Sequence, residues 1–406
     1  MPHFSRREFQ KFDTAQYTRC MFANRTRWNL QENALHRELI ELRASGKQIF
    51  DLTRSNPTEC GFAYNSQEIQ RALAYDQIVR YEPHPRGLES ARSAVAGYYE
   101  ERGANISGLD LVLSSGTSEG YSFIFRLLCN PGDEVLIPSP GYPLFEFLAD
   151  LCDVKLLHYP LIYDHGWQVD FSSLSTACTQ KTRAIIVVNP NNPTGHYSVP
   201  DEQAQIRRFC VERNIAIIAD EVFFDFGLTA DRRQSFAAGG DALTFTLSGL
   251  SKICGLPQMK LAWIAVSGPA KLKQEALARL EVIADAYLSV GTPVQLAAPD
   301  LLATGGNFRA QAMARVRSNL AKLDSQLSAQ SVCSRFKCEG GWSAVLRVPA
   351  QQTDEELAIA LLQQHGVSVH PGHFYNFPRN GHIVVSLIVP DQEFAQGTKR
   401  VLSHFA

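Results

Sequence analysis

The chain has no unbroken apolar run long enough to cross a membrane, and its first residues lack the apolar core of a signal peptide. Neither sign of charge is in excess, because 39 Lys and Arg face 41 Asp and Glu, for a formal net charge of −2 at pH 7. This balance gives no electrostatic basis for binding nucleic acid or an anionic membrane. We therefore expect a cytoplasmic protein that acts on small molecules, with no nucleic acid or membrane partner.

Closely spaced cysteines are also missing. The nine cysteines are scattered along the chain without CxxC pairs, so neither a disulfide scaffold nor a zinc site is indicated. No GxGxxG segment follows an apolar run, which argues against a dinucleotide-binding dehydrogenase. Reduced, mostly buried thiols and no metal site are the simplest interpretation.

What the chain does contain is enough apolar sequence for two domains, with 45% hydrophobic residues in a length of 406. From about residue 110, apolar runs such as "DLVLSS", "DEVLIPS", "RAIIVVN", "NIAIIAD" and "LTFTLS" alternate with helical segments. That alternation predicts an α/β fold, in which helices cover both faces of a mostly parallel sheet.

The two ends of the chain differ from this middle part. Residues 1–50 read as a polar leader and a helix that Gly46 ends, and residues 296–406 read as a small α+β unit. In the latter, Thr353 and Glu356 form a capping-box pattern. We predict a large domain over residues 51–295 and a smaller one from residues 296–406, with the N-terminal arm and helix added to it.

Small and polar residues cluster just after several of the expected strands, where open parallel sheets bind ligands. "SSGTSEG" (Ser114–Gly120) follows one strand and opens a helix, which suits an anion such as phosphate. Taken alone, the segment is more simply explained as an ordinary helix cap by Ser115 or Thr117. Tyr142, in the turn "SPGYPLF", either stacks on a planar ligand or only covers the core.

Three further clusters follow later strands. "NPNNPTG" (Asn189–Gly195) is a rigid, irregular turn at a strand end. Asp220 ends the apolar run "IIAD", where a carboxylate is costly unless it meets a cation or caps the next helix. Lys252 lies in "SGLSKICGL", where small and apolar neighbours make a solvated surface charge unexpected.

Together these features suit a phosphorylated heteroaromatic aldehyde. An anion cradle, a stacking aromatic and an amide would bind such a ligand. A desolvated lysine would bond it covalently, and a carboxylate would keep its ring nitrogen protonated.

The ordered set "SGT", "PGYP", "NPNNPTG", "DEVF" and "SGLSK" resembles the class I/II aminotransferases, which have fold type I of the pyridoxal-phosphate enzymes. The resemblance covers roughly residues 50–390. It implies a large domain with a mostly parallel seven-stranded sheet between helices, and a smaller domain built from both ends of the chain. It also implies a pyridoxal 5'-phosphate cofactor, transfer of an amino group from an amino acid or amine to an oxo acid, and a homodimer with shared active sites.

By the same resemblance, three residues are catalytic. Lys252 is the Schiff-base lysine, Asp220 pairs with the pyridine nitrogen, and Asn192 donates to the phenolic oxygen. Tyr142 would stack on the ring. The phosphate would be bound by Gly116, Thr117, Ser118, Ser251 and Lys260, and by Tyr81 across the dimer interface.

The chain departs from the family's pattern at four positions. Phe223 replaces the usual tyrosine that donates to the phenolic oxygen, and Lys260 replaces an arginine, so the bidentate fork on phosphate is lost. Gly249 stands where a serine is usual, with Ser248 one place early. In "HIVVSLIV", Val384 takes the place of the arginine that clamps the substrate α-carboxylate.

A valine cannot bind a carboxylate, so either another arginine does so or the substrate has no carboxylate there. Arg54, in "LTRSNPT", and Arg379 are the candidates, with Arg54 favoured because its segment usually borders the substrate.

Two other functions remain open. The cofactor-binding residues barely distinguish an aminotransferase from a lyase that catalyses α/β-elimination on the same fold. The chain could also be a ligand-binding regulator that has lost turnover, although the retained lysine, aspartate and asparagine argue against this.

Overall fold

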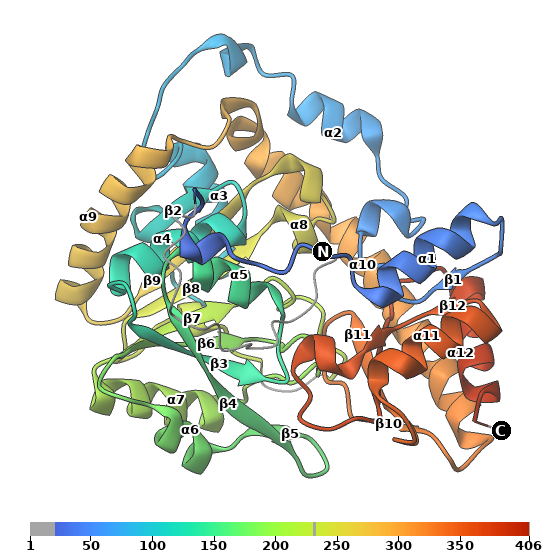
Figure 1. Ribbon diagram of the computed structural model, residues 1–406. Coiled ribbons are helices and arrows are strands. Elements are labelled where there is room, and N and C mark those ends of the chain that lie inside the picture. Colours follow the sequence, from blue (N-terminus) through green and yellow to red (C-terminus); the bar gives the residue numbers. More distant parts are fainter. Residues whose placement is uncertain (1–20, 230–232, 406) are drawn as a thin grey trace.

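The computed structural model describes residues 21–229 and 233–405 (Figure 1). The leader predicted at the start of the chain lies mostly outside these residues. The helix predicted after it is α1 (Ala34–Ala44), which is capped by Asn33 and followed by Gly46 at a φ of +78°. Within the described part of the chain, no helix combines the length and apolarity that a bilayer span requires.

A single large sheet forms the middle of the molecule, in the order β2-β9-β8-β7-β6-β3-β4-β5. Neighbours from β8 to β4 run parallel, whereas β9 is antiparallel to both β2 and β8. The sheet has eight strands rather than the predicted seven, and β5 pairs antiparallel with β4 in a hairpin at one edge. Its strands are β2 (Leu111–Ser114), β3 (Glu134–Ser139), β4 (Lys155–Tyr163), β5 (Trp167–Val169), β6 (Thr182–Val188), β7 (Ala216–Asp220), β8 (Thr244–Gly249) and β9 (Ala262–Ser267).

Helices cover both faces of this sheet, as the alternating pattern predicts. Alternate strand residues pack against α4, α5 and α9 on one face, and against α3, α6, α7 and α10 on the other. Because both faces are covered, β7 and β8 are buried along their whole length and are mostly apolar, with the buried polar residues Thr244, Thr246 and Ser248 on β8. These helices are α3 (Glu89–Glu100), α4 (Thr117–Leu128), α5 (Leu144–Leu151), α6 (Phe171–Ala177), α7 (Pro200–Arg213), α8 (Leu250–Ile253), α9 (Ala270–Tyr287) and α10 (Thr292–Ser328).

A smaller unit lies beside the large sheet and contains α1 and the C-terminal part of the chain (Figure 1), whereas Arg25, near the start of the described chain, contacts Asp153 of the large unit. A four-stranded antiparallel sheet, β10-β11-β14-β13, packs with helices, and β1 pairs parallel with β12. The predicted capping box opens α11. The remaining elements are β1 (Phe50–Asp51), β10 (Ser334–Arg335), β11 (Ser343–Arg347), β12 (Val367–Ser368), β13 (His370–Pro371), β14 (His382–Ser386), α2 (Ser66–Ala72), α11 (Asp354–His365) and α12 (Asp391–Ser403).

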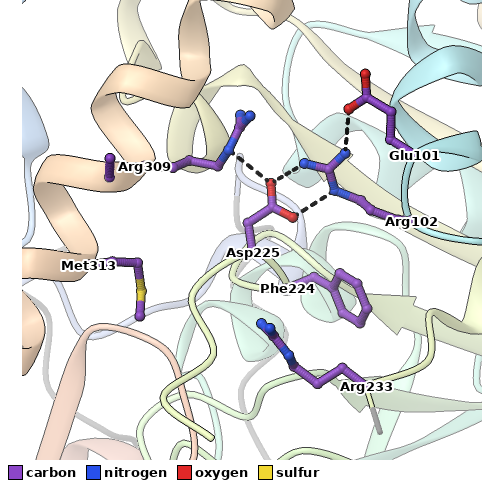
Figure 2. Close-up of a pocket in the computed structure, with 8 residues that line it drawn as sticks. Glu101, Arg102, Phe224, Asp225, Arg233, Arg309 and Met313 are labelled. Atoms are coloured by element: carbon purple, nitrogen blue, oxygen red, sulfur yellow. Dashed lines mark hydrogen bonds and ion pairs between the residues drawn. The ribbon is translucent and has the colours of Figure 1, made fainter. Parts of the chain in front are cut away.

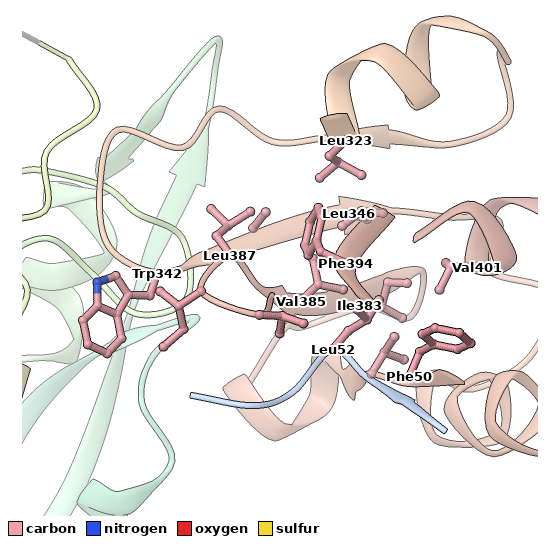
Figure 3. Close-up of a cluster of buried hydrophobic side chains, with 14 of the residues drawn as sticks. Phe50, Leu52, Leu323, Trp342, Leu346, Ile383, Val385, Leu387, Phe394 and Val401 are labelled. Atoms are coloured by element: carbon pink, nitrogen blue, oxygen red, sulfur yellow. The ribbon is translucent and has the colours of Figure 1, made fainter. Parts of the chain in front are cut away.

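The small unit has its own apolar core, to which the N-terminal segment contributes. Phe50 and Leu52 pack among residues of β11, β14 and α12 (Figure 3). The helix α10 runs from the large sheet into this unit and continues through residues 295 and 296 without a break. The predicted domain limits therefore stay a prediction, since the two units share one helix.

Candidate active site

Most of the predicted catalytic and cofactor-binding residues lie at one edge of the large sheet. The strands β3, β6, β7 and β8 are parallel, and β2 is parallel to β8 because β9 is antiparallel to both. Their carboxyl ends therefore meet at the same edge, where the segments after Ser114, Ser139, Val188, Asp220 and Gly249 lie.

Asp220 is buried at the end of β7, with two hydrogen bonds to its carboxylate. Tyr121 Oη donates to one oxygen at 3.0 Å, and the backbone N–H of Val222 donates to the other at 3.2 Å. Burial raises the pKa of Asp220 to about 6, although both hydrogen bonds and the charge of Lys252 oppose the shift. Tyr121 is not among the predicted site residues, although its place one turn after Thr117, in the helix that opens with "SGT", is a sequence signal for it.

Lys252 lies on the short helix α8, which directly follows β8. Burial lowers the pKa of its amine to about 8, while Asp220 and Cys60 act in the opposite direction. The Nζ atom lies 5.2 Å from the ring centroid of Trp342 and 5.7 Å from that of Phe223. A lysine with a lowered pKa in an aromatic surrounding is a nucleophile near neutral pH.

The loop Asn189–Gly195 contacts two other parts of the site. The backbone N–H of Asn189 donates to the carbonyl of Asp220 at 2.8 Å, and Asn191 Nδ2 donates to the carbonyl of Pro140 at 3.1 Å. Asn192 Oδ1 accepts from Ser343 Oγ at 3.5 Å, which leaves the amide N–H groups of Asn192 for another acceptor.

Tyr142 lies two residues after Pro140, the residue whose carbonyl accepts from Asn191. Its ring packs edge-on against Phe145 at 5.8 Å, and burial followed by the charge of Asp220 raises the pKa of its hydroxyl. Tyr142 and Asp220 therefore lie within electrostatic range of each other.

A buried ionic cluster holds the same loop against the small unit. His196 Nε2 contacts Glu202 Oε1 at 2.8 Å, and its Nδ1 lies 3.7 Å from Glu339 Oε2. Despite its burial, the two carboxylates raise the pKa of His196 to about 9. Gly195 is required at this contact, because a Cβ there would lie 2.6 Å from the carbonyl oxygen of Gly340.

The predicted phosphate-binding residues surround the start of α4. Gly116 is the residue before the helix, Thr117 and Ser118 lie in its first turn, and a Cβ on Gly116 would lie 3.6 Å from Lys260 Nζ. The positive end of the helix dipole and a lysine amine thus meet at the same point, which favours an anion. Ser251, half-buried on α8, neighbours Lys252.

Steric crowding explains why Gly249 stands at the position where the family usually has a serine. A Cβ on Gly249 would lie 2.8 Å from the Cβ of Ala262 and 2.9 Å from the carbonyl oxygen of Leu261, on the neighbouring strand. Ser248, one place earlier, is buried, and its Oγ has no hydrogen-bond partner among the described residues.

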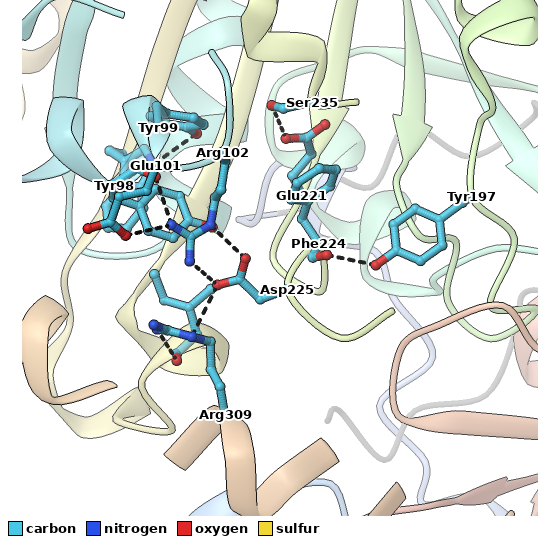
Figure 4. A network of polar contacts seen from close by, with 12 residues as sticks. Tyr98, Tyr99, Glu101, Arg102, Tyr197, Glu221, Phe224, Asp225, Ser235 and Arg309 are labelled. Atoms are coloured by element: carbon cyan, nitrogen blue, oxygen red, sulfur yellow. Dashed lines mark hydrogen bonds and ion pairs between the residues drawn. The ribbon is translucent and has the colours of Figure 1, made fainter. Parts of the chain in front are cut away.

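The segment after Asp220 is anchored by arginines behind the site. Arg102 bonds Asp225 through Nε at 2.7 Å and Nη2 at 2.9 Å, and Arg309 Nε lies 3.5 Å from the same carboxylate (Figures 2 and 4). These residues border a cavity of about 650 Å³. Glu221 is held separately by Ser235 (Figure 4). Both carboxylates fix the turn that carries Asp220 and Phe223.

Comparison with known proteins identifies the family. The model of the class I and II aminotransferases matches residues 62–398, which is most of the chain. The chain belongs to the class I and II aminotransferase family. The predicted family and the predicted enzyme class, a transferase of amino groups, are therefore confirmed.

Among curated relatives of this aminotransferase, the glutamate-pyruvate aminotransferase AlaA of Haemophilus influenzae is 30% identical over 265 residues, which cover 64% of this chain and 65% of that protein. The alanine aminotransferase of Mycobacterium tuberculosis is 27% identical over 385 residues, covering 90% of this chain and 88% of that protein. Among solved structures, an alanine aminotransferase from Pyrococcus furiosus superposes with a TM-score of 0.84 at 23% identity, covering 91% of this chain and 95% of that one. This last likeness confirms the predicted fold.

Four other positions singled out in the sequence make no hydrogen bond or ion pair with Lys252 or Asp220 among the described residues. Arg54 Nη2 contacts Glu393 Oε2 at 3.2 Å, and Arg379 is exposed near the end of the small sheet. Tyr81 is 75% exposed, on the segment after α2. Val384 is buried in an apolar cluster, so its position in this aminotransferase offers a substrate no polar group.

Proposed function

We propose that this aminotransferase binds pyridoxal 5'-phosphate at Lys252 and transfers an amino group from an amino acid to a 2-oxo acid. The observation that carries the proposal is that Lys252 and Asp220 are both buried, lie within electrostatic range of each other and have oppositely shifted pKa values. Burial moves the pKa of the lysine down to about 8 and that of the aspartate up to about 6. Opposed shifts of this kind are typical of groups that exchange protons in an active site.

The residues around this pair fit the cofactor. Gly116, Thr117, Ser118, Ser251 and Lys260 would bind the phosphate, with the Lys260 amine already beside Gly116. Tyr142 would cover the ring. Asn192 would donate its amide N–H to the phenolic oxygen, since its carbonyl oxygen accepts from Ser343. Phe223 offers no second donor to that oxygen.

When bound, the cofactor supplies a ring that accepts electrons from the substrate carbon. Asp220 holds a proton at the ring nitrogen, and Tyr121 keeps its carboxylate in place at 3.0 Å. The Lys252 amine, neutral at mildly alkaline pH, takes up and returns the proton at the reacting carbon. Phe223 and Trp342 border the amine and exclude water from it.

Two observations bear on the substrate class. One is the names of the relatives, and the other is that Val384 stands where the family has an arginine that binds the substrate α-carboxylate. The relatives are named for alanine, glutamate and pyruvate, all of which carry an α-carboxylate. We propose Arg54 as the group that binds it. Arg379 is the weaker candidate, because its side chain lies in an exposed turn.

We further propose a cytoplasmic homodimer. Ile78, Val79 and Tyr81 are exposed apolar side chains on a segment that extends away from the rest of the protomer (Figure 1). A partner subunit would cover them and receive Tyr81 at its phosphate site.

The test of this function is a panel of amino acids and amines mixed with the protein loaded with pyridoxal phosphate. Appearance of the pyridoxamine form, with the matching oxo product, supports amino transfer, and Lys252→Ala should abolish it. Release of ammonia together with pyruvate would instead establish a lyase. Absence of cofactor from Lys252 on peptide mapping after borohydride reduction would contradict the proposal.

A further inference from the structure

We propose that Glu393 is a positioning residue that holds the Arg54 guanidinium and releases it to a substrate carboxylate. The affinity for carboxylates would then be set by competition between Glu393 and the substrate for one arginine. This inference rests on the proposed function, in which Arg54 binds the substrate carboxylate.

The backbone on both sides of Arg54 is fixed. Before it, the backbone N–H and the hydroxyl of Thr53 donate to Asp51 Oδ1 at 3.0 and 2.6 Å. After it, Asn56 caps a short helical turn by accepting from the backbone N–H of Thr58 at 3.2 Å. Any change of partner by Arg54 is therefore a rotation of its side chain, which does not require the loop to rearrange.

Packing places Glu393 opposite this arginine. Glu393 and Gly397 are four residues apart on α12, so they lie on the same face of the helix. A Cβ on Gly397 would lie 2.8 Å from Leu52, which shows that this face presses against the chain two residues before Arg54. Glu393 lies one turn before Gly397 on α12, and its carboxylate contacts Arg54, which follows the turn at Leu52 and Thr53.

The pair is exchangeable because it is neither fully buried nor bidentate. Its one contact joins Arg54 Nη2 and Glu393 Oε2 at 3.2 Å, and the two side chains are 25% and 40% exposed, although Oε2 itself is buried and has no hydrogen bond among the described residues. Ion pairs this accessible to solvent favour the bound geometry by about 1.5- to 5-fold. A substrate carboxylate that accepts two parallel N–H groups forms the stronger contact.

Arg54 lies on the side of the site that carries Lys252. The Cys60 thiol is within electrostatic range of both, since Arg54 opposes the raised pKa of Cys60 and Cys60 opposes the lowered pKa of Lys252. The neighbouring Arg315 is committed elsewhere, through Asp391 at 2.7 Å and the carbonyl of Cys60 at 3.1 Å. Arg54 is thus the cation in this region whose contact a ligand can replace most easily.

The experiment measures binding of 3-phenylpropionate and of its uncharged amide, 3-phenylpropionamide, by calorimetry. Neither compound has an amine, so neither reacts with the cofactor-loaded protein. Arg54→Ala should weaken binding of the acid by about 10- to 100-fold and leave the amide unchanged. Glu393→Gln should tighten binding of the acid by about 1.5- to 5-fold, because the competitor for Arg54 is lost.

Two further variants make the test specific. The control variant Glu212→Gln, which alters an exposed glutamate on α7, should leave the affinity for the acid unchanged. In Arg54→Ala/Glu393→Gln, the gain from the glutamine should disappear, because Glu393 acts only through Arg54. A gain that persists without Arg54, or weaker binding of the acid by Glu393→Gln, would overturn the proposal.

The same titrations on the cofactor-free chain separate this proposal from the proposed function. If Lys252 does not bind the cofactor, the proposed function fails. The response of acid affinity to Arg54 and Glu393 would still be measurable, and its presence or absence decides the role of Glu393.

Discussion

At the scale of single residues, the site depends on a lysine whose amine has a pKa below its ordinary value. Lys252 sits against two aromatic rings, and its amine lies within electrostatic range of the Asp220 carboxylate. Desolvation disfavours the ammonium form more than this carboxylate favours it. The net result is a pKa of about 8, from an ordinary value of 10.5. A neutral amine is what reacts with an aldehyde.

This predicts the pH dependence of covalent capture of pyridoxal phosphate by the cofactor-free chain. The capture rate should rise with pH through a midpoint near 8, followed by stopped-flow absorbance. Asp220→Asn should shift the midpoint lower, because the lost carboxylate favours the ammonium form. A midpoint that stays near the ordinary lysine value would contradict the role given to burial, and Lys252→Ala serves as the blank.

At the scale of elements, the contact between β8 and β9 decides which side chains the loop before Lys252 can carry. Gly249 lies opposite Ala262 in the register of the two strands. The strands approach so closely there that a Cβ at position 249 would meet backbone and side-chain atoms of the partner strand. The family's serine is therefore excluded by packing, and in the proposed cofactor site the phosphate would rely on other donors.

Gly249→Ser should accordingly destabilise the protein rather than improve phosphate binding. We expect a loss of about 1–3 kcal/mol in the free energy of unfolding, measured by urea denaturation, because the strands must separate to admit the side chain. Gly249→Ser/Ala262→Gly should recover part of that loss, since it removes the Cβ that lies 2.8 Å from the new one. Unchanged stability of the single variant would show that the strands yield without cost.

At the scale of the whole molecule, the segment after α2 exposes apolar side chains that nothing in a single protomer covers among the described residues. Residues after α2 reach away from the body (Figure 1), and Val79 and Tyr81 are 86% and 75% exposed. Scattered exposed apolar residues are ordinary, but here they are close together on one projecting segment. The proposed dimer would bury them and bring Tyr81 to the partner's cofactor.

Light scattering should therefore give a mass twice that of the 45.1 kDa chain. Val79→Asp should shift the protein toward monomers and lower its affinity for the cofactor, because a charge would be buried at the interface. The matched control is Val211→Asp, which alters a half-exposed valine on α7 and should change neither property. A monomeric wild type that retains cofactor would refute the shared site.

Much of this aminotransferase is determined by its sequence alone. Apolar runs alternate with helical segments and end in small or polar residues, so Lys252, Asp220, Asn192 and Tyr142 were predictable as one group at the strand ends. That follows because parallel strands bring their carboxyl ends to a common edge, whatever the spacing along the chain. The added strand β5 was missed because a three-residue strand has too little pattern to recognise.

Other features were decided only by the tertiary structure. Tyr121 and Trp342 reach Asp220 and Lys252 from distant segments, and no local pattern records a contact of that kind. The reason for Gly249 lies on the neighbouring strand, and the partner of Arg54 lies more than three hundred residues away, on α12. The motifs therefore predict which residues lie at the site. The pKa values of these residues, their contact partners and the steric limits on them depend on the packing of segments that are remote in sequence.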